Sequence, residues 1–342
     1  MKNIRILLLS ITMIAFASCE RAFMRDNEPQ NPVNVFDYLW NKVDQQYAFF
    51  DVKGVNWDSV YEVYRPRVYD DMDNDSLFNV CAAILNTLKD GHTNLIANFD
   101  VSHNDSVYYK MYAEKNIDVN TVVLNYLTVN YHTTGSFVHN AIRNGEVAYI
   151  RYSSFMDDIS DSDLMYLFDD RYKDCRGIIL DLRQNGGGNI DNIRKLLSCF
   201  DNHGQTLYQT QIKSGPGHDE FTELTCVFAP ENNLFTQPYT KPVAVLIDRG
   251  SYSATSFFSV CTMAYDNIKL FGDYSGGGLG LPNGGILPNG WAYRFSITRT
   301  IAIDGGNYEN GVPPDVRVLI DPISTAQGID NVIEAAADWI LN

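Results

Sequence analysis

The order of apolar and polar positions changes along the chain, from helical spacing near the amino end to short strand-like runs further on. From Val35, the segment VFDYLWNKVDQQYAFF repeats apolar and aromatic residues at helical spacing. Asp75 stands where it could cap a second helix that ends at Leu88. The pattern therefore predicts a helical amino-terminal domain over residues 35–97.

Residues 98–145 have a different pattern from this helical domain. They contain alternating stretches such as VNTVVLNYLTVNYHTT, which are typical of strands and turns. We therefore expect a β-rich connecting segment between the helical domain and the rest of the chain.

From Glu146 onward, short β-branched runs end in polar or glycine-rich loops, and a helical stretch follows each run. The runs are EVAYIRYSSF, RGIILDLRQNGGG and KPVAVLIDRGSYS. Strands that feed loops and helices in this order form an α/β core, in which functional groups gather at strand ends. Residues 146–342 are therefore predicted to form such a core.

The first nineteen residues have the features of an export signal. After a basic start, the apolar run Ile6–Phe16 precedes two small residues and Cys19. The run is shorter than the roughly 20 residues of a membrane-spanning helix, and small residues before a cysteine are typical of bacterial lipoprotein signals. We expect removal of residues 1–18, lipidation of Cys19 and a tether over residues 19–34, which would place the protein at the bacterial cell envelope. An ordinary cleaved signal with an incidental cysteine is the alternative.

Charge narrows the range of partners. The chain has 26 lysines and arginines and 42 aspartates and glutamates, a formal net charge of −16. Without residues 1–18, which carry two basic residues, the balance would be 24 against 42, or −18. A surface this acidic repels nucleic acid and anionic lipid. Membrane contact would therefore come from the lipid anchor alone.

The cysteines beyond Cys19 are scattered along the sequence and form no metal-binding pattern. They are Cys81, Cys175, Cys199, Cys226 and Cys261. The sequence has no CxxC pair among them and no histidine cluster beside them. It therefore indicates neither a metal site nor a cofactor, and it predicts no particular disulfide.

Three loops have chemical character, and the first is rich in glycine. Asn185-Gly186-Gly187-Gly188 follows a buried strand predicted over Gly177–Leu182. Consecutive glycines can turn backbone N–H groups toward an anion at the start of a helix. The spacing fits neither the dinucleotide-binding fingerprint nor a P-loop, so a plain tight turn stays the alternative.

The second loop, DRGSYSA, joins the apolar strand Val243–Ile247 to an apolar helix that begins near Thr255. Ser253 of this loop would lie at the positive end of the helix, and the following backbone N–H could face the oxygen of a tetrahedral adduct. Such a serine caps the helix unless a general base lies close to it. The third loop offers a base, because His92 follows a helix end in LKDGHT, whereas the other five histidines lie in settings that predict surface loops.

The motifs LKDGHT, AYIRYSSF, GIILDLRQNGGG, VLIDRGSYSATS, LFGDYSGGG and YENGVPPDVRV follow one another in this order. The series resembles that of the tail-specific, or carboxyl-terminal processing, serine peptidases, and in particular the branch that includes the tricorn core. The resemblance spans about residues 35–340. It implies an α/β fold with a crotonase/ClpP-like β/α spiral core, preceded by a small helical domain.

The resemblance assigns roles to the residues of these loops. Ser253 matches the nucleophile, which is the second serine of a Ser-x-Ser-Ala pattern. The N–H of Ala254 would be one oxyanion donor. The other donor would come from the glycine run, at Gly186 or Gly187.

The general base differs between the branches of this family. One branch uses a lysine after the nucleophile helix, at the position of Gly278, and residues 270–342 contain no lysine. The other branch uses a histidine, which matches His92, and a glutamate, which matches Glu309 in a motif one residue shorter than the family's. A serine precedes the histidine in that branch and helps to link it to the glutamate. Here that position is Gly91.

The function implied is hydrolysis of peptide bonds by acyl transfer, as a serine endopeptidase or carboxyl-terminal processing peptidase that acts on a peptide or protein substrate without a cofactor. A peptide-binding module of the PDZ kind would not fit between His92 and Glu146, so substrate would bind in the core cleft or to residues 98–145. Two alternatives stay open. One is a catalytically impaired peptidase fold that binds a peptide or another ligand, and the other is a hydrolase of non-peptide acyl substrates. The oligomeric state is open as well.

Overall fold

The computed structural model describes residues 29–200, 204–231, 235 and 238–342. The expected signal peptide, Cys19 and most of the expected tether lie outside these residues. Within the described part of the chain, no helix combines the length and the apolar character that a membrane span requires.

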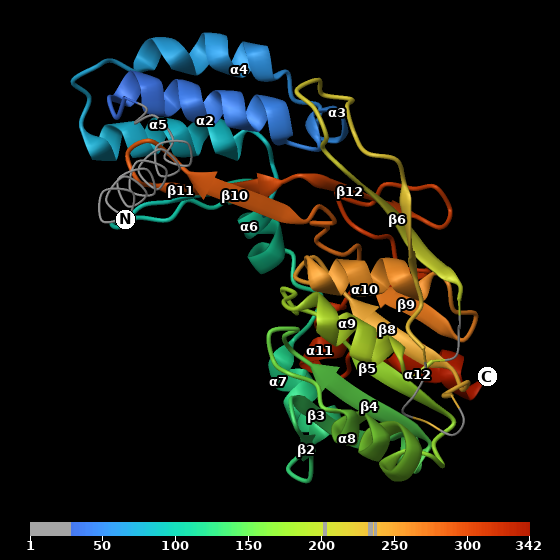
Figure 1. The fold of residues 1–342 in the computed structure, drawn as a ribbon. Helices are drawn as coiled ribbons and strands as arrows, with labels where there is room; N and C mark the ends of the chain where they lie inside the picture. The colour runs from blue at the N-terminus through green and yellow to red at the C-terminus, as the bar shows by residue number, and fades with distance from the viewer. Residues whose placement is uncertain (1–28, 201–203, 232–234, 236–237) are drawn as a thin grey trace, which may run out of the picture.

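Helices form the amino-terminal region of the molecule (Figure 1). They are α2 (Pro32–Gln46), α3 (Phe50–Lys53), α4 (Trp57–Tyr64), the 3-10 turn η1 (Arg65–Arg67) and α5 (Asn74–Asn86). Asn31 caps α2 by accepting a hydrogen bond from the N–H of Asn34, and a proline opens the helix, where an N–H is not needed. The apolar residues of α2 are buried on one face, as their spacing predicts.

A three-stranded antiparallel sheet packs against these helices, and two of its strands come from the far end of the chain. The strand order is β1 (Asn94–Ile96), β11 (Ala292–Ser296) and β10 (Pro282–Ile286). Trp291 and Phe295 are buried in the same apolar cluster as Phe36 and Phe78 of the helices. Residues predicted to belong to the α/β core therefore complete the helical domain.

A seven-stranded sheet forms the centre of the second region. Its strand order is β13 (Val316–Arg317), β9 (Ile268–Gly272), β8 (Val243–Ile247), β5 (Gly177–Asp181), β4 (Val147–Tyr152), β3 (Phe137–Ile142) and β2 (His132–Thr134). The five strands from β13 to β4 pair in parallel, and β3 and β2 add antiparallel pairs at one edge. Every residue of β5 and β8 is buried, as in parallel sheets that are covered on both faces.

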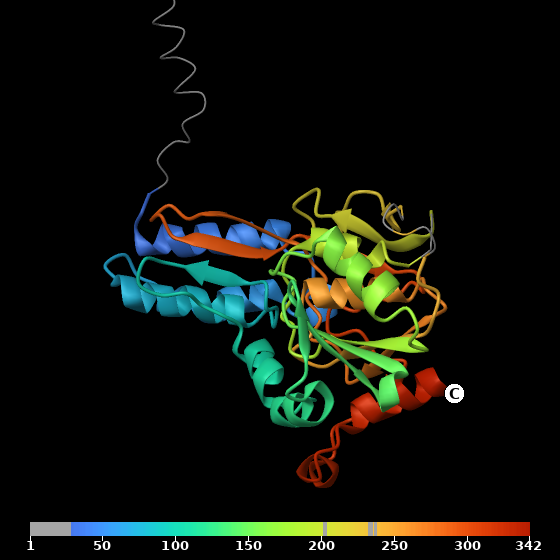
Figure 2. The ribbon, with the colours of Figure 1, turned by 90° about the horizontal axis from the view of Figure 1, so that it is seen from below.

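Alternate residues of the central strands point to opposite faces of this sheet. Ile178 of β5 shares an apolar cluster with α9 (Ile190–Leu197) and α10 (Ala254–Thr262). Its neighbour Ile179 shares a different cluster with α12 (Asn331–Leu341). In Figure 2 the helical region lies to one side of this layered core.

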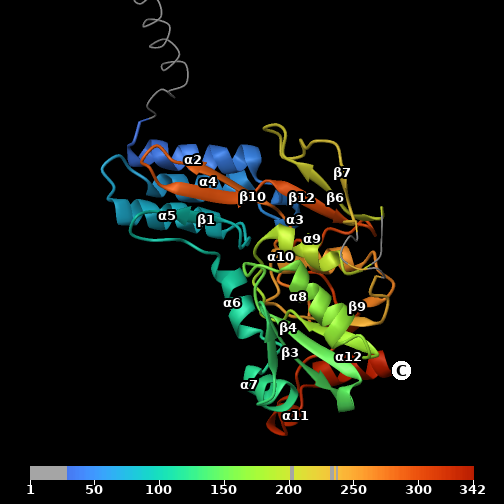
Figure 3. The same cartoon turned by 60° about the horizontal axis from the view of Figure 1, so that its bottom comes forward.

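A third, antiparallel sheet contains β12 (Thr298–Ala302), the strand that follows the β10–β11 hairpin along the chain (Figure 3). It consists of β12, β6 (Thr206–Ile212) and β7 (Thr225–Phe228). The remaining elements of the core are η3 (Arg143–Gly145), α8 (Asp161–Met165), η4 (Tyr166–Arg171) and α11 (Pro322–Ala326). The expected fold class, an α/β core preceded by a small helical domain, is confirmed.

The connecting segment over residues 98–145 differs from its prediction as β-rich. It contains α6 (Asp105–Ala113), α7 (Val119–Thr121) and the π-helical η2 (Val122–Leu127) before it reaches β2 and β3. Val122, Tyr126 and Leu127 are buried in a cluster with the sheet, and their spacing is helical. Packing against the sheet therefore overrides the strand preference of these β-branched and aromatic residues.

The cap of α5 also differs from its prediction. Asp73 caps this helix in place of Asp75, and its Oδ1 accepts a hydrogen bond from Ser76 N at 2.9 Å. Asp75 lies in the first turn, where a negative charge still favours the helix. The helix ends at Asn86, two residues before the predicted end at Leu88.

Candidate active site

Ser253 lies at the junction between β8 and α10, in a strained backbone conformation. Its φ of 54° and ψ of −118° fall outside the regions that residues with a side chain usually occupy. Its N–H donates to Gly277 O at 3.0 Å, and its carbonyl accepts from Phe257 N at 2.9 Å, so the backbone is held on both sides. The side chain makes no capping hydrogen bond to the helix. Strain of this kind is concentrated at functional sites.

The Ser253 hydroxyl faces His92 instead of the helix. The distance from Ser253 Oγ to His92 Nε2 is 2.9 Å, although the two residues are 161 positions apart in the sequence. His92 is 7 % exposed. Burial lowers the pKa of the imidazole, and the nearby Asp90 carboxylate opposes that shift. A neutral imidazole that meets a hydroxyl at this distance can accept its proton.

The backbone around Ser253 leaves two N–H groups open. Among the described residues, the N–H groups of Ala254 and Gly186 donate to no recorded acceptor. The N–H of Gly187 is already bound, because it donates to Asn185 Oδ1 at 3.0 Å. Of the two glycines named from the sequence, Gly186 is therefore the one that can still donate.

Gly187 has a different role, because it lets the glycine loop approach the backbone around Ser253 closely. A Cβ atom on Gly187 would lie 2.8 Å from Ala254 N and 2.6 Å from Tyr252 O, and the φ of this residue is +94°. Only glycine combines that conformation with that proximity. The glycine loop can therefore reach the backbone on which Ser253 stands.

Glu309 is buried beside this site but does not contact the imidazole. It is 1 % exposed, its Oε2 accepts from Leu279 N at 2.6 Å, and its Oε1 lies 3.1 Å from Lys53 Nζ. No hydrogen bond joins it to His92 within the described residues. His92 Nδ1 meets no acceptor there with good hydrogen-bond geometry, although the backbone of Gly280 lies close enough to raise the pKa of the imidazole. Burial and the Asp90 carboxylate raise the pKa of Glu309 to about 7, against the opposing effect of Lys53.

Two residues of this cluster were not found by sequence reasoning. Asp90 is fully buried, and its carboxylate accepts from His92 N and from Ser296 Oγ, both at 2.8 Å. Lys53 is 5 % exposed in its side chain, and its ammonium also donates to Asn310 Oδ1 at 2.9 Å. Asp90 was visible in the LKDGHT motif as a second polar group two residues before the histidine. Lys53 gave no local signal, because its partners lie at the other end of the chain.

Asp248 fastens the nucleophile loop to the glycine loop. Its Oδ1 accepts from Gln184 N at 2.8 Å and from Gly250 N at 3.0 Å. Its Oδ2 accepts from Gln184 Nε2 at 2.8 Å and from Asn116 N, in the connecting segment, at 3.2 Å. One buried carboxylate therefore fixes three chain segments relative to one another.

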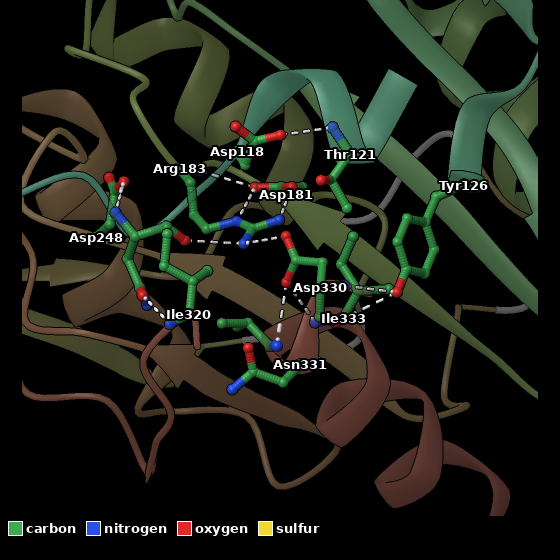
Figure 4. A network of polar contacts seen from close by, with 12 residues as sticks. Asp118, Thr121, Tyr126, Asp181, Arg183, Asp248, Ile320, Asp330, Asn331 and Ile333 are labelled. Atoms are coloured by element: carbon green, nitrogen blue, oxygen red, sulfur yellow. Dashed lines mark hydrogen bonds and ion pairs between the residues drawn. The ribbon is translucent and has the colours of Figure 1, made fainter. Parts of the chain in front are cut away.

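Arg183 extends this network across the ends of the central strands. Figure 4 shows its guanidinium between Asp181 and Asp330, which it meets at 2.7 and 2.9 Å. It also donates to the carbonyl oxygen of Asn116 at 2.9 Å. All three charged side chains are buried, so removing one partner would leave an uncompensated charge. These buried ion pairs and hydrogen bonds thus hold the loops of the candidate site in place.

The other histidines with described side chains lie outside this cluster, and one of them differs from its prediction. His139 is fully buried in β3 instead of lying in a surface loop, with its ring bonded to Tyr172 and to Thr134. Burial lowers its pKa to about 4, so it stays neutral and structural. The described residues contain no group of three His, Cys, Asp or Glu side chains that could hold a metal ion.

A cleft of about 520 Å³ opens onto Ser253 and His92. Most of its lining is apolar, and α6 forms one wall. The apolar side chains are those of Val107, Tyr108, Met111, Met156, Ile190, Phe257, Leu281 and Pro282. Arg294 is the one lysine or arginine among the residues that line it. A cleft of this size and character suits an extended organic ligand such as a peptide.

Comparison with known proteins matches both regions of the molecule. Residues 146–318 match the profile of peptidase family S41, and residues 29–86 match that of the tricorn protease C1 domain. The chain belongs to peptidase family S41. The resemblance to tail-specific and tricorn-like peptidases, inferred from the motifs, is therefore confirmed.

Relatives of this S41 chain include one solved structure that it matches over nearly its full length. A crystal structure from Parabacteroides merdae ATCC 43184, described as a candidate peptidase, is 34% identical, with a TM-score of 0.85 over 92% of this chain and 98% of that one. A protein of Staphylococcus aureus (strain bovine RF122 / ET3-1), named "Probable CtpA-like serine protease", is 25% identical over 178 residues, which are 52% of this chain. That match covers 34% of the relative, so the S41 chain spans about a third of the length of the curated relatives it matches.

The tricorn protease shares the fold of this S41 chain. Its crystal structure superposes with a TM-score of 0.52 and 15% identity, over 91% of this chain and 36% of that chain. At this identity the likeness concerns the fold alone.

Proposed function

We propose that this protein is a serine peptidase that hydrolyses peptide bonds, with Ser253 as nucleophile and His92 as general base. The observation that carries the proposal is the 2.9 Å contact between Ser253 Oγ and His92 Nε2 in a member of family S41. A hydroxyl is a weak nucleophile unless a base accepts its proton as it attacks. The low pKa that burial gives to His92 keeps this base unprotonated near neutral pH.

The reaction would proceed through an acyl-enzyme. His92 takes the Ser253 proton while the oxygen attacks the peptide carbonyl, and then returns it to the leaving amine. Water, activated by the same imidazole, releases the acyl group. Besides the water, each step uses side chains that line the cleft.

The oxyanion of the tetrahedral intermediate would be held by the N–H groups of Ala254 and Gly186. Both N–H groups are open in the described structure, and both belong to loops that Asp248 fastens together. Fixed donors stabilise a developing negative charge without reorganisation. Losing one of them costs about 2.7–4 kcal/mol in a measured protease.

Glu309 would stabilise the charged imidazole as the third group of a Ser-His-Glu site. The carboxylate must be ionised for this role, and Lys53 favours its ionised form. Asp90 adds a second negative charge and holds the backbone of His92. The helical domain thus supplies the base, Asp90 and Lys53, whereas Glu309 comes from the carboxyl-terminal part of the chain.

The substrate would be a peptide or protein that lies in the apolar cleft. Val107 and Met111 of α6 line this cleft, so both the core and the connecting segment would contact the substrate. Non-peptide acyl substrates would use the same nucleophile. A binding protein without activity is less well supported, because the contact between serine and histidine is intact.

Turnover of unmodified peptides tests this proposal against its alternatives. Wild-type protein should release new amino termini from a peptide library, and Ser253→Ala should release none while keeping the wild-type melting temperature. Hydrolysis of simple esters without any peptide cleavage would support the non-peptide hydrolase instead. Absence of both activities would leave the binding protein.

The protein would work at the bacterial cell envelope, anchored through lipid on Cys19. The sequence of residues 1–19 supports this part of the proposal, and the acidic surface is compatible with an anchor that is lipid alone. Metabolic labelling with a fatty acid should mark wild-type protein and not Cys19→Ser. Equal labelling of both would rule out the anchor.

A further inference from the structure

At two positions this chain has a glycine where a branch of its family has a residue that takes part in the general base. Both glycines lie against the side chain of Tyr252. Gly91 stands where the histidine branch has a serine, and Gly278 stands where the other branch has a lysine. A Cβ atom on Gly91 would lie 2.6 Å from the Tyr252 hydroxyl, and one on Gly278 would lie 2.7 Å from it. The two glycines therefore leave the space that the tyrosine occupies.

Backbone conformation does not explain the glycine at position 91. Gly278 has a φ of +76°, which favours glycine by itself, but the φ of Gly91 is outside the left-handed range. A serine could adopt the backbone of residue 91. A side chain there would meet chiefly the Tyr252 ring and hydroxyl, and then Val107 Cγ1 at 3.0 Å.

Tyr252 is built into the candidate site on several sides. It precedes Ser253, its N–H donates to Asn185 O at 3.0 Å, and its ring centroid lies 5.1 Å from that of His92. Its side chain is buried, with 6 % exposure of the residue. Burial, followed by the charges of Asp90 and Glu309, raises the pKa of its hydroxyl well above the usual value, so the group stays a neutral donor.

Several polar atoms of this cluster are buried with few partners in the described structure. His92 Nδ1 and Tyr252 Oη have no hydrogen bond of good geometry, and Glu309 Oε1 has only its ion pair with Lys53. Buried polar atoms are nearly always paired, so such a group in one cluster calls for an explanation. A hydroxyl can accept from one group and donate to another, which matches the needs of an imidazole N–H and a carboxylate.

We propose that the Tyr252 hydroxyl takes the place of the serine that Gly91 replaces. In the reacting enzyme it accepts a hydrogen bond from His92 Nδ1 and donates one to Glu309 Oε1. Both protons stay on their own atoms, and the charge of the imidazolium is stabilised through the hydroxyl. The proposal rests on the proposed function, because it gives Tyr252 a positioning role toward the base of that reaction.

Glu309 is the carboxylate that this bridge would use. Both oxygens of Asp90 are already occupied, by His92 N and by Ser296 Oγ. Glu309 Oε1 has only its ion pair with Lys53. Hydrogen bonds at catalytic sites often tighten only when substrate is bound, so a small closure would complete the bridge.

The first test is Tyr252→Phe, which removes only the hydroxyl. We expect kcat for peptide cleavage to fall about ten- to a hundredfold, because hydrogen bonds to charged groups are lost. The acidic limb of the pH profile should move to lower pH, because an imidazolium without this support has a lower pKa. Tyr239→Phe is the matched control, since Tyr239 also has a buried hydroxyl without a partner but lies outside the site.

A compensating pair of substitutions tests the replacement itself. Gly91→Ser should lose activity because the new side chain meets Tyr252, and Tyr252→Ala should lose it because the bridge is gone. The double variant Gly91→Ser/Tyr252→Ala restores the family's serine and the room for it, so it should exceed both single variants in kcat. All variants are compared by melting temperature and by labelling with a fluorophosphonate.

Two results would overturn the inference. One is a Tyr252→Phe enzyme with the rate and pH profile of the wild type, and the other is a double variant no more active than the better single variant. Either result with an active wild type would leave the proposed function standing. A wild-type protein without peptidase activity would instead contradict the proposed function, and the bridge with it.

Discussion

The two halves of the candidate site are held by different kinds of structure. Ser253 and its proposed oxyanion donors lie on loops that follow the buried strands β5 and β8, and Asp248 links these loops by hydrogen bonds. His92 comes from the end of the helical domain, and it reaches the serine through packing between distant segments. The half with Ser253 is held by hydrogen bonds between neighbouring loops of the core. The position of His92 depends on how the helical domain packs against the core.

The two halves also differ in the charged side chains that they contain. The nucleophile half supplies neutral backbone donors, whereas the base half gathers Asp90, His92 and Lys53 around Glu309. Charges buried together respond strongly to the loss of one partner. The helical domain should therefore control the pH dependence of the enzyme, and the core should control its maximal rate.

His92→Ala gives the largest effect, because it removes the general base that accepts the proton of Ser253. We expect peptide cleavage to fall by roughly 10⁴- to 10⁶-fold, as when the base of a serine protease is removed. The variant should stay folded, since the backbone N–H of residue 92 keeps its hydrogen bond to Asp90, and the melting temperature checks this. Progress curves at high enzyme concentration measure the loss, and a variant with more than a tenth of wild-type activity would contradict the role of His92.

Gly187→Ala tests the core half by itself. Its Cβ atom would crowd Ala254 N, so the two oxyanion donors should separate and kcat should fall about 10²- to 10³-fold. Gly145→Ala is the matched control, because Gly145 has a similar φ of +90° but no atom within 4 Å of the added Cβ. Equal kcat values for the two variants would show that the glycine loop does not support the oxyanion.

Lys53→Met should have a smaller effect, and one that depends on pH. Glu309 has a pKa of about 7 with Lys53 beside it, and losing this cation raises that pKa further. Because the ionised carboxylate supports catalysis, activity falls as pH drops through the pKa, and the acidic limb moves to higher pH. We expect about a tenfold loss at pH 7 that is regained at higher pH, and near wild-type behaviour for Lys53→Arg.

The exposed Lys115 provides the control for this charge effect. Lys115→Met removes the same charge from the surface and should leave the pH profile in place. If Lys53→Met lowers activity equally at every pH, then Lys53 supports the structure and not the ionisation of Glu309.

The strands, loops and helix of the nucleophile half could be predicted from local sequence, whereas the role of Ser253 was assigned through the family resemblance. The strand Val243–Ile247 and the glycine run each precede a helix within a few residues, and the structure brings Gly187 against the backbone of Ser253. Both the buried strand and the start of α10 follow from apolar runs. Elements predicted from such short-range patterns agree with those of the structure.

The base half was only partly visible in the sequence. His92 and Glu309 were named through the family resemblance, but Lys53 precedes Asn310, which it also contacts, by 257 residues. The helical conformation of residues 119–127 was missed because packing against the sheet decides it. The meaning of Gly91 depends on Tyr252, a residue from a different loop. Such relations arise only when distant segments meet.

Mapping the adduct of a fluorophosphonate by mass spectrometry tests the central claim most directly. Wild-type protein should carry the adduct on the peptide that contains Ser253, and His92→Ala, treated identically and still folded, should carry almost none. An adduct on another residue, or equal labelling of Ser253 in both proteins, would contradict a serine nucleophile activated by His92.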